Sequence, residues 1–175
     1  MNAKLLILTF VLFCFLNCKN ETAKTNEISL IYYNGSLNYL VKKKIQKKDS
    51  FFLRHYKMLI EDADKALEFK PNPVINKTRI PPSKNKHDYL SYAPYKWPDN
   101  SKLAGLPWVT KDGEINPISQ GYDTDFKRTQ EFFSAVETLS WAFYFSNEEK
   151  YSVKTIDLIN TWYLNEETKV NPNIN

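Results

Sequence analysis

Apolar residues recur every three or four positions between Ser50 and Phe69, with charged residues between them. This spacing puts the apolar side chains on one side of a helix, so it predicts an amphipathic helix with one buried face. The apolar positions are Phe52, Tyr56, Leu59, Ile60, Ala63, Ala66 and Leu67. A shorter helix is predicted just before it, over Leu37 to Ile45. Five lysines lie near the end of this shorter helix, at Lys42, Lys43, Lys44, Lys47 and Lys48. A solvated helix end favoured by the helix dipole is the simpler interpretation of that run, and binding of a polyanion is the alternative.

Helical spacing resumes after Asp123 and Asp125, either of which could cap the new helix. Its apolar positions are Phe126, Phe133, Val136, Leu139 and Phe143, and the pattern ends at Phe145. Ser146 followed by Glu149 fits a capping box and predicts a second helix at once. That helix continues to about Leu164, with Tyr151, Thr155, Leu158, Ile159 and Trp162 in helical register. The short connection predicts an antiparallel helical hairpin. Only residues 28–33 show an alternation that could suit a strand.

The segment between the two helical regions has a different composition. Eight of the nine prolines fall between Pro71 and Pro117, together with Gly105, Gly113 and Gly121. Each residue ahead of a proline is pushed toward extended geometry, so a long irregular segment is predicted. Such segments are uncommon in compact domains and are often binding loops or lids. This loop is therefore the first place to look for function.

The N-terminus has the pattern of an export signal. An apolar run from Leu5 to Leu16 follows Lys4 and ends at Asn17-Cys18. Its twelve residues fall short of the roughly 20 that span a bilayer, and the pattern is typical of a secretory leader. The leader resembles a bacterial lipoprotein signal, so residues 1–17 are expected to be removed and Cys18 to carry lipid. Plain cleavage and an uncleaved leader are the alternatives, because Asn17 departs from the small residue usual there.

Residues 18–27 are polar and are interpreted as a tether, which leaves 28–175 as one domain. We therefore expect an exported protein of the periplasm or the outer-membrane surface, held to the membrane only through its N-terminal lipid. Lys and Arg outnumber Asp and Glu by 24 to 20, which mildly favours acidic partners. Export makes nucleic acid an unlikely partner.

Cysteine and histidine are too sparse to predict a metal site or a disulfide. Both cysteines, Cys14 and Cys18, lie in the leader, and His55 and His87 are the only histidines. No Cys or His cluster has ligand spacing, so no metal and no cofactor are expected. His55 lies within the first amphipathic helix and is interpreted as a partly buried packing residue.

Several short motifs carry a resemblance to a known family. Those of the loop are Arg79-Ile80-Pro81-Pro82-Ser83, Lys86-His87-Asp88-Tyr89, Ala93-Pro94-Tyr95-Lys96-Trp97-Pro98-Asp99, Gly105-Leu106-Pro107-Trp108 and Asp112-Gly113-Glu114-Ile115-Asn116-Pro117. Those of the helical part are Ala135-Val136-Glu137-Thr138-Leu139, Thr161-Trp162-Tyr163-Leu164 and Asn171-Pro172-Asn173-Ile174-Asn175. In order and spacing they resemble the N-terminal part of the alginate lyase domain family, from about Lys57 to the end. Lys96-Trp97 departs from the two aromatic residues that relatives often have there.

The resemblance implies a fold and an activity. The fold would be all-α, a partial α/α toroid, that is, an incomplete ring of helical hairpins, with a long irregular aromatic loop. The activity would be cleavage of alginate or a related polyuronate by β-elimination. The catalytic Asn-His element of similar lyases lies beyond the Asn171–Asn175 segment, and this sequence contains no Asn-His pair. The chain is therefore expected to be a truncated N-terminal fragment, inactive alone, with its catalytic residues unknown. A noncatalytic surface lipoprotein that binds acidic glycans and a gene product without independent function are the alternatives.

Candidate substrate-binding residues lie in the loop and after the last helix. His87, the only histidine in the loop, could bind a substrate carboxylate or fix the loop through its backbone. Tyr89, Tyr95 and Trp97 could stack on sugar rings, although rings such as Tyr92 and Trp108 could equally pin the loop to the helices. Asn173 and Asn175 could donate to and accept from sugar hydroxyls and carboxylates. The expected partner is an acidic polysaccharide.

Overall fold

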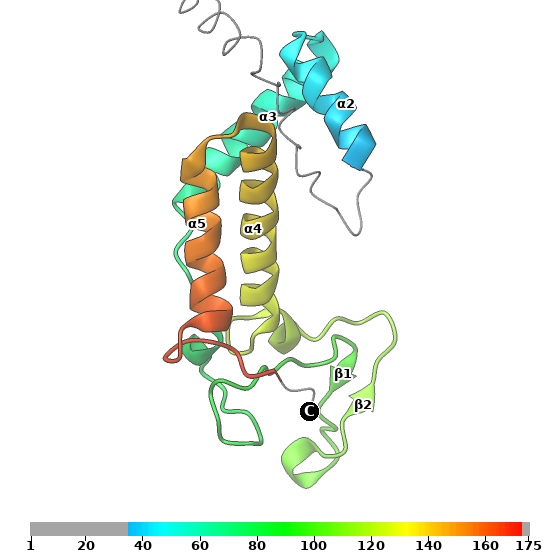
Figure 1. The fold of residues 1–175 in the computed structure, drawn as a ribbon. Coiled ribbons are helices and arrows are strands. Elements are labelled where there is room, and N and C mark those ends of the chain that lie inside the picture. The colour runs from blue at the N-terminus through cyan, green and yellow to red at the C-terminus, as the bar shows by residue number, and fades with distance from the viewer. Residues whose placement is uncertain (1–34, 173–175) are drawn as a thin grey trace, which may run out of the picture. The chain divides into compact units, whose positions relative to one another are not determined.

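The computed structural model describes residues 35–172, drawn in colour in Figure 1. The chain divides into two units between Lys43 and Lys44. The leader, the tether, Cys18, residues 28–33, Asn173 and Asn175 lie outside the described residues. Helix α2 (Gly35–Gln46) confirms the shorter predicted helix and contains no buried residue. No helix within residues 35–172 is long and apolar enough to cross a membrane.

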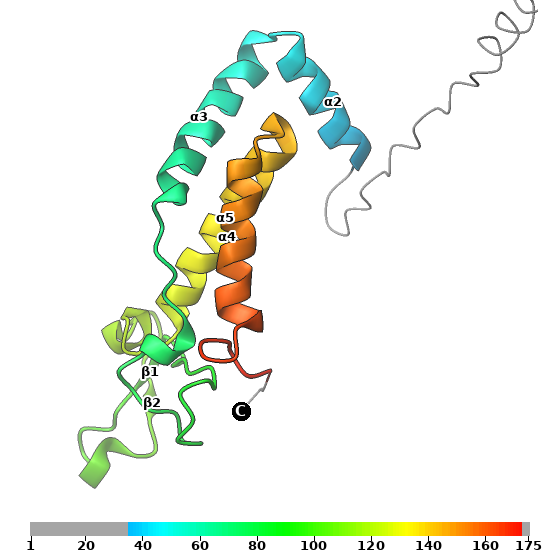
Figure 2. The same ribbon diagram turned by 60° about the vertical axis from the view of Figure 1, so that its left-hand side comes forward.

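Three further helices form the core of the larger unit. They are α3 (Ser50–Leu67), α4 (Phe126–Ser146) and α5 (Glu149–Ile159), and α5 continues into a π-helical turn, η4 (Asn160–Leu164). Helices α4 and α5 lie side by side as the predicted antiparallel hairpin, and α3 packs mainly against α4 (Figures 1 and 2). The core between them consists of Ala63, Val74, Phe132, Ala135, Leu139, Ala142, Tyr151, Leu158 and Trp162.

The starts of α3 and α5 are built differently. Asp49 caps α3, accepting from the amides of Phe51 at 3.2 Å and Phe52 at 3.5 Å. The predicted capping box at Ser146 is wrong, because α4 runs on to that residue. The Ser146 hydroxyl donates to the carbonyl of Ala142 at 2.7 Å and accepts from the amide of Glu148 at 3.0 Å. Ser146 is therefore the last residue of α4 and does not cap the start of α5.

The buried face of α4 also differs from the prediction. Phe133 and Phe143 are 53% and 40% exposed, whereas Phe132 is 1% exposed. The buried residues are Arg128, Phe132, Ala135, Leu139 and Ala142. These positions have helical spacing too, so α4 carries two overlapping apolar stripes that spacing alone does not distinguish. His55 was likewise expected to be partly buried but is exposed, with Nδ1 2.9 Å from the carbonyl of Phe51.

The long loop between α3 and α4 is irregular, as predicted, but it is not without structure. Short helical turns occur at η1 (Val74–Asn76), η2 (Leu103–Gly105) and η3 (Pro117–Gln120). A two-stranded antiparallel ribbon lies between them, formed by β1 (Lys96–Trp97) and β2 (Val109–Thr110). The ribbon was not predicted, because two-residue strands are too short to show an alternating pattern. Figure 1 shows the loop gathered at one end of the α4–α5 hairpin.

A buried ion pair fixes this loop to the start of α4. The Nζ of Lys77 lies 2.9 Å from Oδ2 of Asp125, and both side chains are fully buried. The same ammonium donates to the carbonyls of Val74 at 2.7 Å and Lys86 at 2.6 Å. The carboxylate of Asp125 accepts from the amide of Leu90 at 2.9 Å, and the Asp125 amide donates back to the Leu90 carbonyl at 2.8 Å. Asp125 therefore occupies the N-cap position of α4, but its side chain holds the loop and does not cap the helix.

Arg128 completes this cluster from the first turns of α4. Its Nε lies 3.2 Å from Oδ1 of Asp125 and donates a hydrogen bond to the carbonyl of Thr124. The contact with Asp125 is therefore an ion pair without a hydrogen bond. One terminal nitrogen donates to Oδ1 of Asn72 at 2.6 Å, and the other donates to the carbonyl of Tyr122. We call Lys77, Asp125 and Arg128 the buried ion cluster.

Burial shifts the titration of both members of the ion pair. It raises the pKa of Asp125, an effect that the Leu90 amide and Lys77 partly offset. It lowers the pKa of Lys77, which Asp125 counteracts. The desolvation of these charges is tolerated because each one is hydrogen bonded or paired inside the cluster.

We predict that Asp125→Ala lowers the free energy of unfolding by about 3–5 kcal/mol, because it leaves two buried cations without their carboxylate. Asp62→Ala is the matched control. It breaks the exposed pair in which Lys65 Nζ lies 2.9 Å from Asp62, and it should cost at most about 1 kcal/mol. Urea denaturation followed by circular dichroism measures both values. Equal costs for the two variants would show that the cluster does not stabilise the fold.

Candidate functional site

The loop meets the end of the chain at the same end of the hairpin. The amide of Asn171 donates to the carbonyl of His87 at 2.9 Å. Its side-chain Nδ2 donates to Oδ1 of Asp88 at 2.6 Å, and Asp88 is only 6% exposed. The segment after η4 is turned back toward the loop by a bond from the amide of Val170 to the carbonyl of Trp162 at 2.8 Å. Two stretches more than 80 residues apart in sequence are thereby joined.

His87 is part of this junction. Its Nδ1 lies 2.6 Å from the carbonyl of Lys169, so Nδ1 carries the hydrogen and donates it. Half-buried, the ring fixes the loop through the backbone, which was one of the two predicted uses. A neutral imidazole of this tautomer keeps Nε2 as an acceptor, and a protonated one makes Nε2 a donor for an anion. Contact of His87 with a substrate carboxylate stays a prediction.

Trp97 is held in place by two residues that follow the ribbon, Glu114 and Lys111. Its Nε1 donates to the carbonyl of Glu114 at 3.0 Å. The ammonium of Lys111 lies 4.7 Å from the centroid of the indole and covers one face of the ring. Lys111 also lies 3.6 Å from a carboxylate oxygen of Glu114, and its amide donates to the carbonyl of Tyr95 at 3.0 Å. A sugar could stack only on the remaining face of Trp97, next to a fixed positive charge.

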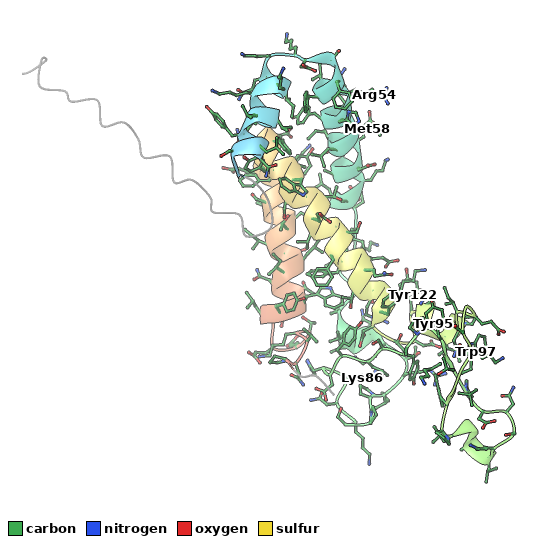
Figure 3. All side chains as sticks on the ribbon, turned by 90° about the vertical axis from the view of Figure 1, so that its right-hand side faces the viewer. Arg54, Met58, Lys86, Tyr95, Trp97 and Tyr122 are labelled. Carbon is green, nitrogen blue, oxygen red and sulfur yellow. The ribbon has the colours of Figure 1, made fainter. Side chains whose placement is uncertain are left out.

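Tyr89 and Tyr95 are more open. Tyr89 is 36% exposed and Tyr95 is 44% exposed. The rings of Tyr92 and Trp108 instead lie 5.0 Å apart, and Arg79 lies over Tyr92 at 5.7 Å. Tyr92 and Trp108 therefore pack within the loop, and stacking of Tyr89 or Tyr95 on a sugar stays a prediction. Figure 3 shows Tyr95 and Trp97 along the loop beyond Tyr122, with Lys86 on a separate part of it.

Two residues that sequence reasoning did not select also shape this surface. Asn116 is 1% exposed. Its Nδ2 donates to the carbonyl of Lys96 at 2.8 Å, which stabilises β1. The Asn116-Pro117 dipeptide at the start of η3 was the sequence feature that could have indicated this residue. Tyr122 donates its hydroxyl hydrogen to Glu131, and that bond is the main reason its pKa is raised. The Tyr122 hydroxyl is therefore engaged with Glu131 of α4.

The loop surface combines accessible rings with positive charge. Its exposed cations are Arg79, Lys84, Lys86, Lys96, Lys102 and Lys111. Stacking surfaces beside cations suit a long anionic ligand whose units have apolar faces. No group of His, Cys, Asp or Glu side chains suited to a metal ion occurs within residues 35–172. Asn173 and Asn175 follow directly on the Asn171 junction but lie outside the described residues, so their predicted role is untested.

Comparison with known proteins gives two findings. A family model described as alginate lyase matches residues 74–175. The structure is similar to the crystal structure of an alginate lyase from Bacteroides ovatus, with 41% sequence identity and a TM-score of 0.74. That similarity covers 80% of this chain and 36% of the other, so the chain spans about a third of that protein. No curated protein matches. The predicted fold class, an all-α partial α/α toroid, is confirmed by the helices and by this similarity.

Proposed function

This chain belongs to the alginate lyase family, and on that basis we propose that it forms a substrate-binding part of a polysaccharide lyase for alginate or a related polyuronate. The observation that carries the proposal is the long loop, fixed by the buried ion cluster, which presents Tyr89, Tyr95 and Trp97 beside exposed cations. A polyuronate offers one carboxylate on each sugar and an apolar face on each ring. The loop surface offers cations for the carboxylates and aromatic rings for the apolar faces.

The chemistry of β-elimination indicates which step these residues could serve. A base removes the proton at C5, a double bond forms between C4 and C5, the C4–O4 bond breaks, and O4 takes up a proton. Negative charge that builds on the C6 carboxylate must be stabilised by nearby donors or cations. Lys111 is suited to stabilise this charge on the carboxylate. We assign no base or acid, because the sequence has no Asn-His pair.

Asn173 and Asn175 are proposed to extend the same surface. They come directly after Asn171, whose backbone and side chain are both bonded to the loop at His87 and Asp88. Amides serve both hydroxyls and carboxylates, which are the polar groups of a polyuronate.

We predict that the 175-residue chain binds polyuronates but does not cleave them. Ultraviolet absorbance of the unsaturated uronate product measures cleavage on alginate and several other polyuronates, with the Bacteroides ovatus relative as the positive control. Calorimetry measures binding on the same preparations. Turnover by this chain on the order of 1 per second or more would contradict the prediction and assign the chemistry to His87 and Tyr89.

The same pair of measurements separates the two candidate functions. A noncatalytic protein that binds acidic glycans is the second candidate, favoured because the rings and exposed cations of the loop account for binding without any catalytic group. Binding without product, both here and in any longer natural form of the chain, supports that second function. If the chain shows no binding and no product, both functions are excluded for these residues.

We predict that Trp97→Ala weakens binding of an alginate oligosaccharide by about 1–3 kcal/mol, the usual strength of one aromatic stack. Trp97→Phe keeps a ring but loses the bond to the Glu114 carbonyl, so it should retain most of the affinity. Phe51→Ala is the control, because Phe51 is 64% exposed but lies at the start of α3. Calorimetry on folded variants decides the matter. An unchanged affinity for Trp97→Ala would limit Trp97 to fixing the loop.

We also propose that the protein is exported and anchored by lipid on Cys18, as the leader pattern favours. Cys18→Ala should move the protein from the membrane fraction to the soluble fraction. Cys14→Ala is the matched control, since Cys14 lies inside the leader and should leave fractionation unchanged. Mass spectrometry of the wild-type N-terminus tests for the lipid directly. Unchanged membrane association together with an unmodified N-terminus would disprove the anchor.

A further inference from the structure

Tyr122 is an accessible ring just ahead of α4 whose position is fixed from several sides. The residue is 44% exposed. Its hydroxyl donates to a carboxylate oxygen of Glu131, and its backbone carbonyl accepts from the buried guanidinium of Arg128. A ring that stays largely in water adds little to the core, so these contacts do more than bury it. They present the ring to solvent in one orientation.

A lysine of α4 covers one face of this ring. The Nζ of Lys127 lies 4.5 Å from the centroid of the Tyr122 ring, which is within the range of a cation–π contact. Glu131 lies four positions after Lys127, where the two could form a helical ion pair, but its carboxylate accepts from Tyr122 instead. Within residues 35–172, Lys127 forms no ion pair with a carboxylate. Its charge is therefore available to a ligand.

The same combination of groups occurs at the ribbon. Lys111 lies 4.7 Å from the centroid of the Trp97 ring, and the indole nitrogen of Trp97 donates to the carbonyl of Glu114. In both places a lysine covers one face of a ring whose polar atom donates to a glutamate residue. No second aromatic ring of the described residues packs against either Trp97 or Tyr122. Each place therefore offers an aromatic face with a cation beside it.

A short anchored turn connects these two places. Asn116, which begins this connection, donates to the carbonyl of Lys96 in β1. The turn that follows it, η3, contacts α4 and ends two positions before Tyr122. The ribbon and Tyr122 are thus carried by one hydrogen-bonded framework. Figure 3 shows Tyr122, Tyr95 and Trp97 in succession from the start of α4 along the loop.

We propose that Tyr122 and Lys127 form a second uronate subsite, which extends the site on the ribbon toward the start of α4. The proposal rests on the proposed function of the loop in binding polyuronates. The uncovered face of Tyr122 takes the apolar face of a sugar ring, and Lys127 pairs with the carboxylate of that sugar. Every unit of a polyuronate presents both groups, so one chain can occupy both subsites. The preferred ligand of the loop is therefore an oligomer and not a single uronate.

Glu131 gives this second subsite a nearby charge of the opposite sign. Its bond with the Tyr122 hydroxyl raises the pKa of Tyr122, so the ring stays protonated and neutral. The same carboxylate repels the carboxylate of a uronate. Glu131→Gln keeps an oxygen that can accept from Tyr122 and removes the charge, so it should strengthen binding. Lys127→Gln should weaken binding. A purely structural role for these contacts predicts no gain of affinity in either variant.

Calorimetry with alginate oligosaccharides of two to six sugars tests the proposal. The wild-type affinity should rise with length once the ligand spans both subsites. For the longest oligosaccharide, Lys127→Gln should lower the affinity about 2- to 5-fold, as expected for one exposed ion pair. The shortest oligosaccharide should be affected less. Tyr122→Ala should cost the longest one about 10-fold through loss of a stack, whereas Tyr122→Phe keeps the ring and should retain most of the affinity.

Two controls separate the subsite from general electrostatic attraction. Lys57→Gln removes the same charge from an exposed position of α3, and it should leave the affinity unchanged at every ligand length. Neutral mannan oligosaccharides offer sugar rings without carboxylates, so Lys127→Gln should not alter their binding. Circular dichroism verifies that each variant is folded.

The possible failures are distinguishable. If the wild-type chain binds no alginate oligosaccharide of any length, the proposed function of the loop is wrong, and the second subsite with it. If the chain binds them but Lys127→Gln has the wild-type affinity at every length, the second subsite alone is disproved. An equal loss at all lengths, or the same loss in Lys57→Gln, would also overturn it, because the lysine would then act only through the overall charge.

Discussion

A fully buried ion pair between Lys77 and Asp125 holds the long loop to the hairpin of α4 and α5. It joins a residue of the loop after α3 to the N-cap residue of α4. Charges are buried at considerable cost, and here that cost is offset because backbone carbonyls, the Leu90 amide and Arg128 satisfy them. Removing one member would unbalance the others, so the loop and the hairpin are stabilised as one unit.

The helices were predictable because each has a strong local pattern. The stripe from Phe52 to Leu67 and the proline-rich segment after it correctly marked α3 and the loop. The buried face of α4 was not predictable, because Phe132 and Phe133 both fit an apolar stripe and only packing against α3 and α5 selects between them. The ion cluster escaped prediction for a related reason. Lys77 is far from Asp125 and Arg128 in sequence, and a single charged residue gives no sign of burial.

The sequence predicted the region of the candidate site better than it predicted the roles of individual residues there. The density of rings and prolines pointed to the loop, and His87 was correctly seen as a residue that could fix it through the backbone. The roles of Lys111, Asn116 and Tyr122 depend on contacts across turns of the loop, which no local pattern reveals. For Trp97, no local pattern indicates that a lysine covers one face of the indole ring.

The paired bonds between Leu90 and Asp125 have a consequence for how this fold can diversify. They close the stretch from residue 91 to 124 at its base, where the Leu90 and Asp125 backbones meet. Apart from η3 and Tyr122, which also contact α4, the stretch is joined to the helices at these two fixed ends. Its length and composition can change by mutation, insertion or recombination while the hairpin beneath stays intact. Substitutions in this segment can therefore change which ligand is preferred without changing how the helical hairpin folds.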